Sequence, residues 1–230
     1  MSPAKLFARL ILQLVVWTAL MGALLFGVGG DWHWPQAWAF IAIFVFGGIG
    51  FGLWLASNDP GLLAQRLGSL AQRGQPLWDR IFMIGAVVLW LTWFVVMALD
   101  AEREHWSDMP VWLNTIGGAL TIGGFLFVLR VFRENSFAAP VIRVQNERAQ
   151  YVIDTGPYAV VRHPMYAGAL GYIFGIPLLL GSWVGLAMTA IFLAGIAWRA
   201  RGEEQFLIRD LPGYADYANR VRWRFIPYVW

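Results

Sequence analysis

Six apolar runs, separated by polar connectors, constrain the fold of this chain more than any other feature of its sequence. The first four are long enough to cross the ~30 Å hydrocarbon core of a bilayer as helices. The last two would each cover only roughly 24 Å, at ~1.5 Å per residue. Gly181-Ser182-Trp183 alone joins these two, which predicts a helical hairpin. The runs occupy residues 10–28, 38–55, 81–99, 111–129, 165–180 and 184–198.

The composition supports this assignment and excludes several classes of protein. Apolar side chains make up 59% of the sequence and charged ones 13%, which excludes a soluble domain with an ordinary surface. Because the chain has no cysteine, disulfides, thiolate metal sites and a cysteine nucleophile are excluded. A net charge of +3 gives no reason to expect a nucleic-acid partner. We therefore expect an all-α integral membrane protein with six transmembrane helices, the last two a tight helical hairpin, followed by a cytosolic C-terminal helical segment.

The distribution of basic residues predicts the orientation of these spans. Lysine and arginine fall before the first run, between the second and third, between the fourth and fifth, and after the sixth. The opposite side of the membrane would hold only Arg103. By the positive-inside rule, both termini lie in the cytosol.

The character of the sequence changes at Arg130, after which charged and turn-forming residues accumulate up to His163. No stretch between these two residues is long and apolar enough to cross a bilayer. We expect residues 1–129 to form an N-terminal four-helix membrane region and residues 130–230 to form the catalytic region.

The most concentrated polar chemistry lies in residues 156–168, directly before the fifth apolar run. Pro164 suits the first turn of a helix, which leaves His163 near the N-cap. The helix N-terminus could then receive an anionic group of a ligand. The alternative is an interfacial anchor, in which Arg162 and two tyrosines sit at the level of the lipid headgroups.

Two adjacent carboxylates follow the sixth run. If the helix continues past Trp198, Glu203 would be an i,i+4 neighbour of Arg199, and Glu204 an i,i+3 neighbour of Arg201. These could be two solvated surface ion pairs. Near a basic helix entrance, however, the two carboxylates could bind a cation such as an amino or sulfonium group.

Histidine offers no metal site in this sequence. His33 and His105 would lie on the side of the membrane opposite His163, so no pair of histidines can share a metal ion. The spacing of serine, histidine and acidic residues indicates neither a hydrolase triad nor a phosphate-binding glycine loop.

Several motifs together resemble a known family. They are Gly156-Pro157-Tyr158, Arg162-His163-Pro164-Met165-Tyr166-Ala167-Gly168, Arg199-Ala200-Arg201-Gly202-Glu203-Glu204, Pro212-Gly213-Tyr214 and Ile226-Pro227. In this combination, residues 130–228 resemble the isoprenylcysteine carboxyl methyltransferases, to which the phospholipid N-methyltransferases are related. The resemblance implies S-adenosylmethionine bound on the cytosolic side and a lipidic methyl acceptor from the bilayer. The segment Asn58-Asp59-Pro60-Gly61-Leu62-Leu63 is similar to bacterial members, so we expect the bacterial inner membrane as location.

The resemblance also implies roles for individual residues. Glu203 would bind the cofactor and Arg199 would hold or orient the acceptor, while Glu204 or His163 would be the base if the acceptor were an amine. Where carboxyl-methylating members have a histidine, this chain has Gln150, and the choice between a carboxylate and an amine acceptor stays open. The other expected cofactor contacts are Gln145, Tyr151, Val152, Ile153, Tyr158, Arg162, His163, Pro164, Met165 and Tyr166.

Two alternative functions remain. The C-terminal half of the sterol and steroid reductases resembles this family, so a nicotinamide-dependent lipid reductase is possible, with Arg222 and Arg224 holding a phosphate. The other is a non-catalytic membrane protein whose basic cytosolic face binds anionic lipid.

Overall fold

The computed structural model of this protein describes residues 3–69 and 71–230. In that part of the chain every named element is a helix, as expected, and the only strand-like pairing is an isolated bridge between Val161 and Trp223. The α-helices are α1 (Pro3–Gly22), α2 (Pro35–Asn58), α3 (Pro60–Arg66), α4 (Leu77–Ala98), α5 (Val111–Glu134), α6 (Pro164–Leu180), α7 (Trp183–Asp210) and α8 (Tyr214–Arg220). Shorter elements are the π-helices η1 (Ala23–Gly27) and η2 (Leu99–Arg103) and the 3₁₀ helices η3 (Asn146–Arg148) and η4 (Gly156–Ala159).

Five helical segments are long and apolar enough to cross a bilayer. They are Ala4–Gly27, Pro35–Asn58, Leu77–Arg103, Val111–Glu134 and Trp183–Asp210. The sixth apolar helix, α6, has 17 residues, and only Gly181 and Ser182 separate it from α7.

The largest difference from the sequence-based prediction concerns α7. The predicted span ended at Trp198, but the helix continues without a break to Asp210 and therefore carries Arg199, Glu203 and Glu204. It ends where Leu211, directly before Pro212, adopts an extended conformation. A residue before proline avoids the helical region because the proline ring would clash with it.

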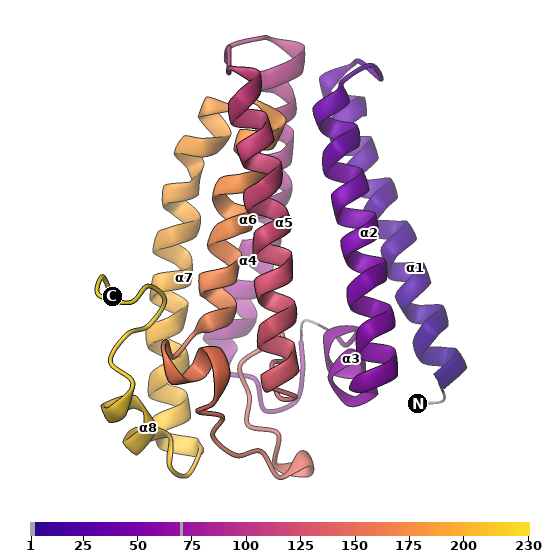
Figure 1. The fold of residues 1–230 in the computed structure, drawn as a ribbon. Helices are drawn as coiled ribbons and strands as arrows, with labels where there is room; N and C mark the ends of the chain where they lie inside the picture. The colour runs from indigo at the N-terminus through magenta and orange to yellow at the C-terminus, as the bar shows by residue number, and fades with distance from the viewer. Residues whose placement is uncertain (1–2, 70) are drawn as a thin grey trace.

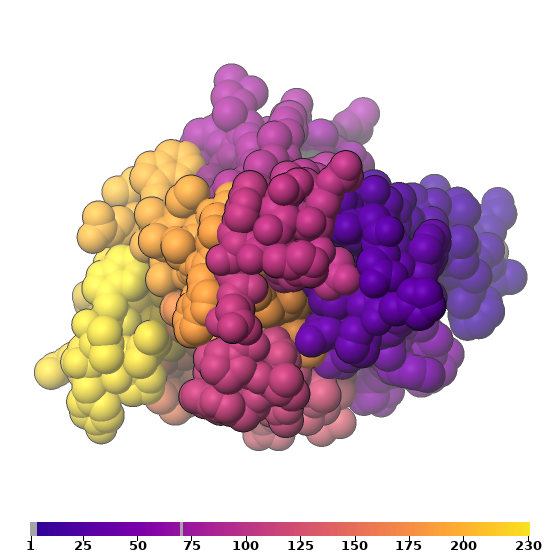
Figure 2. All heavy atoms as spheres, turned by 90° about the horizontal axis from the view of Figure 1, so that it is seen from above, coloured from indigo at the N-terminus to yellow at the C-terminus, as the bar shows by residue number. Residues whose placement is uncertain are grey.

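The helices form one bundle with a pair at its edge (Figure 1). Helices α1 and α2 pack together, and α2 also contacts α5 and α6. Seen down the helix axes, this pair and the C-terminal segment lie on opposite sides of the molecule (Figure 2). Helix α3, helix α8 and the segment between α5 and α6 all gather at one end of the bundle (Figure 1).

Helices α5 and α6 make the closest approach in the bundle. A β-carbon added at Gly175 would lie 2.5 Å from the Thr121 hydroxyl and 2.7 Å from the Gly117 carbonyl oxygen. One added at Gly171 would lie 2.8 Å from the Gly124 α-carbon. The glycine face of α6 therefore packs against α5, because α5 supplies the matching small residues.

Polar and small residues lie on both faces of α5. Asn114 is buried and donates to the Leu178 carbonyl oxygen at 2.8 Å. Thr115, Ala119 and Gly123 are exposed.

A buried carboxylate fixes the connection between α6 and α7 at the other end of the bundle. The Asp100 Oδ2 atom accepts hydrogen bonds from the Ser107 hydroxyl at 2.7 Å, the Ser182 hydroxyl at 2.5 Å and the Val184 backbone N–H at 3.2 Å. Ser182 is also the N-cap of α7 and accepts from the Gly185 N–H. Asp100 thus ties the connection after α4 to the start of α7.

The close approach of α5 and α6 gives a first prediction. Gly175→Ala is expected to lower the free energy of unfolding by about 1–3 kcal/mol, because its methyl group would displace α5 backbone. Thermal unfolding in detergent would measure this loss. Gly123→Ala is the control, since nothing lies within 4 Å of a β-carbon there. Equal stability of the two variants would contradict the described packing.

Candidate active site

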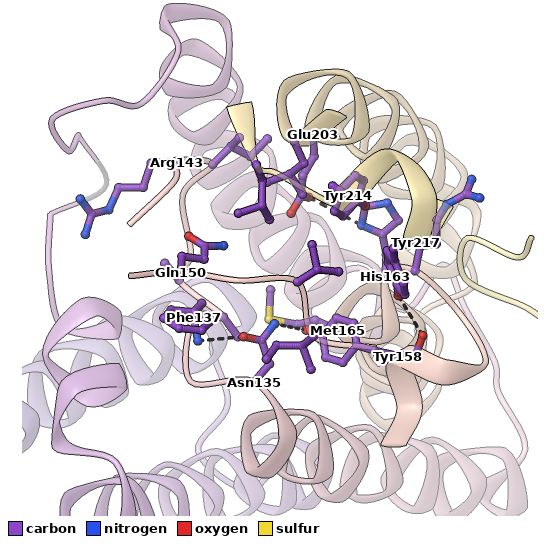
Figure 3. A pocket seen from close by; sticks show the side chains of 18 of the residues that line it. Asn135, Phe137, Arg143, Gln150, Tyr158, His163, Met165, Glu203, Tyr214 and Tyr217 are labelled. Atoms are coloured by element: carbon purple, nitrogen blue, oxygen red, sulfur yellow. Dashed lines mark hydrogen bonds and ion pairs between the residues drawn. The ribbon is translucent and has the colours of Figure 1, made fainter. Parts of the chain in front are cut away.

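A cavity with an empty volume of about 790 Å³, part of it open to solvent, lies at the end of the bundle where α3 and α8 gather (Figure 3). Its walls come from the end of α5, the segment between α5 and α6, the start of α6, the last turns of α7 and α8. Ligand sites are typically concave and mostly apolar, with a few placed polar groups. The wall of this cavity, which combines apolar side chains and tyrosines with a few charged groups, is of this kind.

Glu203 is the one acidic residue among the described residues that line this cavity. Its Oε2 atom accepts a hydrogen bond of 2.7 Å from the Tyr166 hydroxyl, which in turn accepts one of 2.9 Å from Arg199 Nη1. Arg199 Nε donates to Asp79 of α4 at 2.8 Å. A continuous chain of charged hydrogen bonds thus runs from α4 to the cavity.

Arg199 has few donors left for a ligand. Besides Asp79 and Tyr166, it binds the Pro140 carbonyl oxygen through Nη2 at 2.9 Å. The arginine is buried and does not line the cavity. It acts on the cavity through Tyr166 and Glu203.

Glu204, the next residue of α7, is buried beside the cavity and holds a cluster of two arginines and a histidine. Its Oε1 atom accepts from Arg162 Nε at 2.7 Å and lies 3.1 Å from His163 Nε2. Its Oε2 atom accepts from Arg224 Nε at 3.0 Å. All three partners lie outside α7, in the start of α6 and the C-terminal segment.

The start of α6 is built as the sequence predicted, with Pro164 in the first turn and His163 as N-cap. The backbone N–H groups of Arg162 and His163 donate to the carbonyl oxygens of Trp223 and Arg224, at 2.8 Å and 2.9 Å. The C-terminal segment therefore covers this helix entrance and occupies two of its N–H groups.

Tyrosines supply much of the remaining cavity wall. The Tyr158 hydroxyl accepts from Asn135 Nδ2 at 2.7 Å, and the Tyr217 hydroxyl donates to the Tyr158 carbonyl oxygen at 2.8 Å (Figure 3). Burial raises the pKa of Tyr158, Tyr214 and Tyr217. These phenols stay neutral at physiological pH and offer aromatic faces and hydroxyl groups.

The structure brings together nine of the residues that the sequence predicted for the site. Four others lie behind the cavity wall, namely Gln145, Pro164, Arg199 and Glu204. Gln145 is fully buried and binds the Phe137 carbonyl oxygen at 2.8 Å and Arg148 Nη1 at 2.9 Å, so it shapes the wall. The nine that line the cavity are Tyr151, Val152, Ile153, Tyr158, Arg162, His163, Met165, Tyr166 and Glu203.

Of the two alternatives for the carboxylates of α7, the surface ion pairs with Arg199 and Arg201 do not form. Arg199 pairs with Asp79, Glu204 pairs with Arg162 and Arg224, and Arg201 lies 5.5 Å from the centre of the Trp230 ring. Partners on other segments are favoured because they bury the charges together and complete their hydrogen bonds.

Sequence reasoning also missed several residues of the site. Asp79 is fully buried in the first turn of α4, directly before the predicted apolar run, where an acid also suits an exposed helix N-terminus and therefore did not signal a site. Tyr214 belongs to a motif of the resemblance but was given no role, and Asn135, Phe137 and Tyr217 line the cavity without a local sequence signal. Within residues 3–69 and 71–230, no group of three or more histidine and acidic side chains could hold a metal ion.

The Glu204 cluster gives a second prediction. Glu204→Gln is expected to cost about 3–5 kcal/mol of stability, since it leaves buried arginines without their counter-charge. Glu203→Gln should cost far less, because its side chain is 26% exposed and the amide oxygen can still accept from Tyr166. Chemical unfolding of the two detergent-purified variants would compare them. A Glu204 variant as stable as the Glu203 variant would contradict this assignment.

Comparisons with known proteins agree with the sequence motifs. Residues 112–211 match the family model described as phospholipid methyltransferase. Protein-S-isoprenylcysteine O-methyltransferase B of Arabidopsis thaliana is 25% identical over 126 residues, which cover 52% of this chain and 59% of the plant protein. The nickel-cobalt-cadmium resistance protein NccN of Alcaligenes xylosoxydans xylosoxydans is 28% identical over 132 residues, covering 55% of this chain and 57% of that protein. This chain thus spans little more than half the length of these relatives.

A solved structure of the eukaryotic intramembrane Ras methyltransferase ICMT (isoprenylcysteine carboxyl methyltransferase) superposes with a TM-score of 0.49 and 18% identity. The superposition covers 95% of this chain and 86% of that one. At this score the family assignment rests on the sequence matches. Residues 112–211, which include α6, α7 and most of α5, match the phospholipid methyltransferase family model, and the predicted resemblance to the isoprenylcysteine carboxyl methyltransferases is confirmed.

Proposed function

We propose that this protein is an S-adenosylmethionine-dependent methyltransferase that acts on a lipidic or membrane-embedded acceptor, a carboxylate or an amine, at the cytosolic membrane face. The observation that carries the proposal is the position of Glu203. Among the described residues it is the one acidic side chain that lines the cavity, beside tyrosines, apolar residues, amides and the basic residues Arg143, Arg162 and His163, and it lies within the segment that matches a methyltransferase family. The geometry favours neither the reductase nor the non-catalytic alternative.

The residues of the cavity fit S-adenosylmethionine. When bound, this cofactor supplies an activated methyl group on a positively charged sulfur. The Glu203 carboxylate and the rings of Tyr158 and Tyr166 attract a cation, while Val152 and Met165 provide apolar contact. The neighbouring lining residues Tyr151, Ile153, Arg162 and His163 would complete the binding surface.

The chemistry requires the protein mainly to position the reactants and to exclude water. Arg199 and Asp79 hold the Tyr166 hydroxyl, and Tyr166 fixes the orientation of Glu203. For an amine acceptor, His163 is the better placed base, because it lines the cavity, whereas both oxygens of Glu204 already accept hydrogen bonds.

We further propose that α6 is a sixth span and forms a hairpin with α7. Both termini and the cavity would then lie on the cytosolic side of a bacterial inner membrane, with residues 130–230 as catalytic region and residues 1–129 as its membrane support. The start of α1 and helix α8 lie at one end of the bundle and the connection between α4 and α5 lies at the other, which supports the placement of both termini on one side (Figure 1).

Cofactor binding gives the third prediction. S-adenosylmethionine and its demethylated product should raise the thermal unfolding temperature of the purified protein, and reduced nicotinamides should not. Glu203→Gln should weaken this binding at least about tenfold and abolish transfer of a labelled methyl group to extracted membrane lipids. The control is Asp216→Asn, which neutralises an exposed acid of α8. Unchanged binding by the Glu203 variant would refute the site, and stabilisation by nicotinamides alone would refute the function.

The orientation gives the fourth prediction, which the absence of natural cysteines makes simple to test. In intact bacterial cells, a membrane-impermeant maleimide should label Asp108→Cys and leave Asn219→Cys unlabelled. Permeabilised cells should show labelling of both. Labelling of Asn219→Cys in intact cells would overturn the proposed orientation.

A further inference from the structure

Among the described residues, three arginines around the cavity pair with a carboxylate, and a fourth, Arg66, does not. Arg143 pairs with Glu147 at 2.6 Å, Arg162 with Glu204 at 2.7 Å and Arg199 with Asp79 at 2.8 Å. Arg66, at the end of α3, has no carboxylate within ion-pair distance in the part of the chain that the structure describes.

Arg66 lies directly behind the cavity wall. Its Nη1 atom donates to the Ala138 carbonyl oxygen at 3.1 Å and lies 3.7 Å from the Met165 sulfur, and both residues line the cavity. The guanidinium also lies 4.8 Å from the centre of the Phe132 ring. The side chain is thus held in place on three sides.

The other two nitrogens of Arg66 have no partner. Neither Nε nor Nη2 makes a hydrogen bond within the described residues, and neither is among the fully enclosed unpaired polar atoms. The residue as a whole is half-buried. These two guanidinium nitrogens therefore keep N–H groups that no described residue accepts, and a guanidinium binds the oxygens of a phosphate or carboxylate through such a pair.

Arg66 is positively charged at neutral pH although its burial disfavours the charged form. Burial lowers the pKa of Arg66 to about 10, so the guanidinium stays protonated at neutral pH. A partly desolvated cation without a counter-charge is unfavourable. An anion at this position would remove that penalty.

The position of α3 indicates which anion can reach this site. Asp59 ends α2, a membrane-span candidate, and is the N-cap of α3, whose Leu62 and Leu63 are buried against Leu55 and Val128. Helix α3 lies beside the end of α2, at the same end of the bundle where α5 ends and α6 begins (Figure 1). In a bilayer this is the level of the lipid headgroups, and basic pockets between helices at that level bind them.

We propose that Arg66 binds the anionic headgroup oxygens of the lipid acceptor, holding the lipid at the wall of the cavity formed by Ala138 and Met165. The ligand class is a lipid with a phosphodiester or equivalent anion. Its role as acceptor rests on the proposed function, but the binding site itself does not. Arg66 lies outside residues 112–211, so the family match does not assign it.

Binding of short-chain lipids to the detergent-purified full chain tests this site. Wild-type protein should bind dioctanoyl phosphatidylglycerol at least about tenfold more tightly than dioctanoylglycerol, which lacks the anion. Arg66→Gln should remove that preference. Arg66→Lys should retain part of it, because lysine keeps the positive charge but cannot donate two parallel hydrogen bonds as a guanidinium does. Arg130→Gln is the matched control, because it neutralises a basic residue at the same end of the bundle, 57% exposed and paired with Glu134.

Three results would overturn the proposal: equal binding of the two lipids by wild type, an unchanged preference in Arg66→Gln, or full displacement of the lipid by an equal concentration of inorganic phosphate. If Arg66→Gln does not fold, the proposal is tested by the affinities of wild type and Arg66→Lys for the two lipids. Titration of the demethylated cofactor separates the two hypotheses, since its affinity should be the same in Arg66→Gln and wild type. Lipid binding without cofactor binding would leave the site intact and overturn the role of that lipid as acceptor.

Discussion

The cluster around Glu204 is the interaction on which the cavity depends. One buried carboxylate holds Arg162 and His163 at the start of α6 and Arg224 of the C-terminal segment. Successive residues of an α-helix point about 100° apart, so the neighbouring Glu203 faces the cavity while Glu204 faces this cluster. The two adjacent acids of α7 therefore have different roles. Both oxygens of Glu204 pair with arginines, whereas the side chain of Glu203 stays partly exposed in the cavity.

The second ion pair, between Arg199 and Asp79, connects the cavity to the N-terminal half of the chain. Asp79 also accepts from Gln75 and from the Ile142 backbone N–H, at 2.8 Å and 3.0 Å, so it anchors the segment that forms one cavity wall. It lies outside the segment that matches the family model. The position of Glu203 therefore depends on a residue of α4, and the N-terminal helices do more than hold the chain in the membrane.

Predictions from the sequence succeeded where neighbouring residues alone determine the structure and failed where distant segments come together. Hydropathy identified the apolar helices because each run alone satisfies the demands of a bilayer. Rules for neighbouring residues on one helix failed for Arg199 and Glu204. Both form ion pairs with residues of other segments and not with their i,i+4 and i,i+3 neighbours. The glycines of α6 signalled a close helix contact but not which helix makes it. Tyr214 and Tyr217 reach the cavity only through the turn at Pro212 and Gly213, a consequence of tertiary structure.

The unequal lengths of α6 and α7 explain why the polar cavity lies at one end of the bundle. At ~1.5 Å per residue, the 28 residues of α7 extend over roughly 42 Å, more than a ~30 Å hydrocarbon core, whereas the 17 residues of α6 cover roughly 26 Å. Only Gly181 and Ser182 join the two helices, so the excess length of α7 projects beyond the start of α6. The last turns of α7 thus carry Glu203 and Glu204 to a level where charged side chains avoid the cost of hydrocarbon burial.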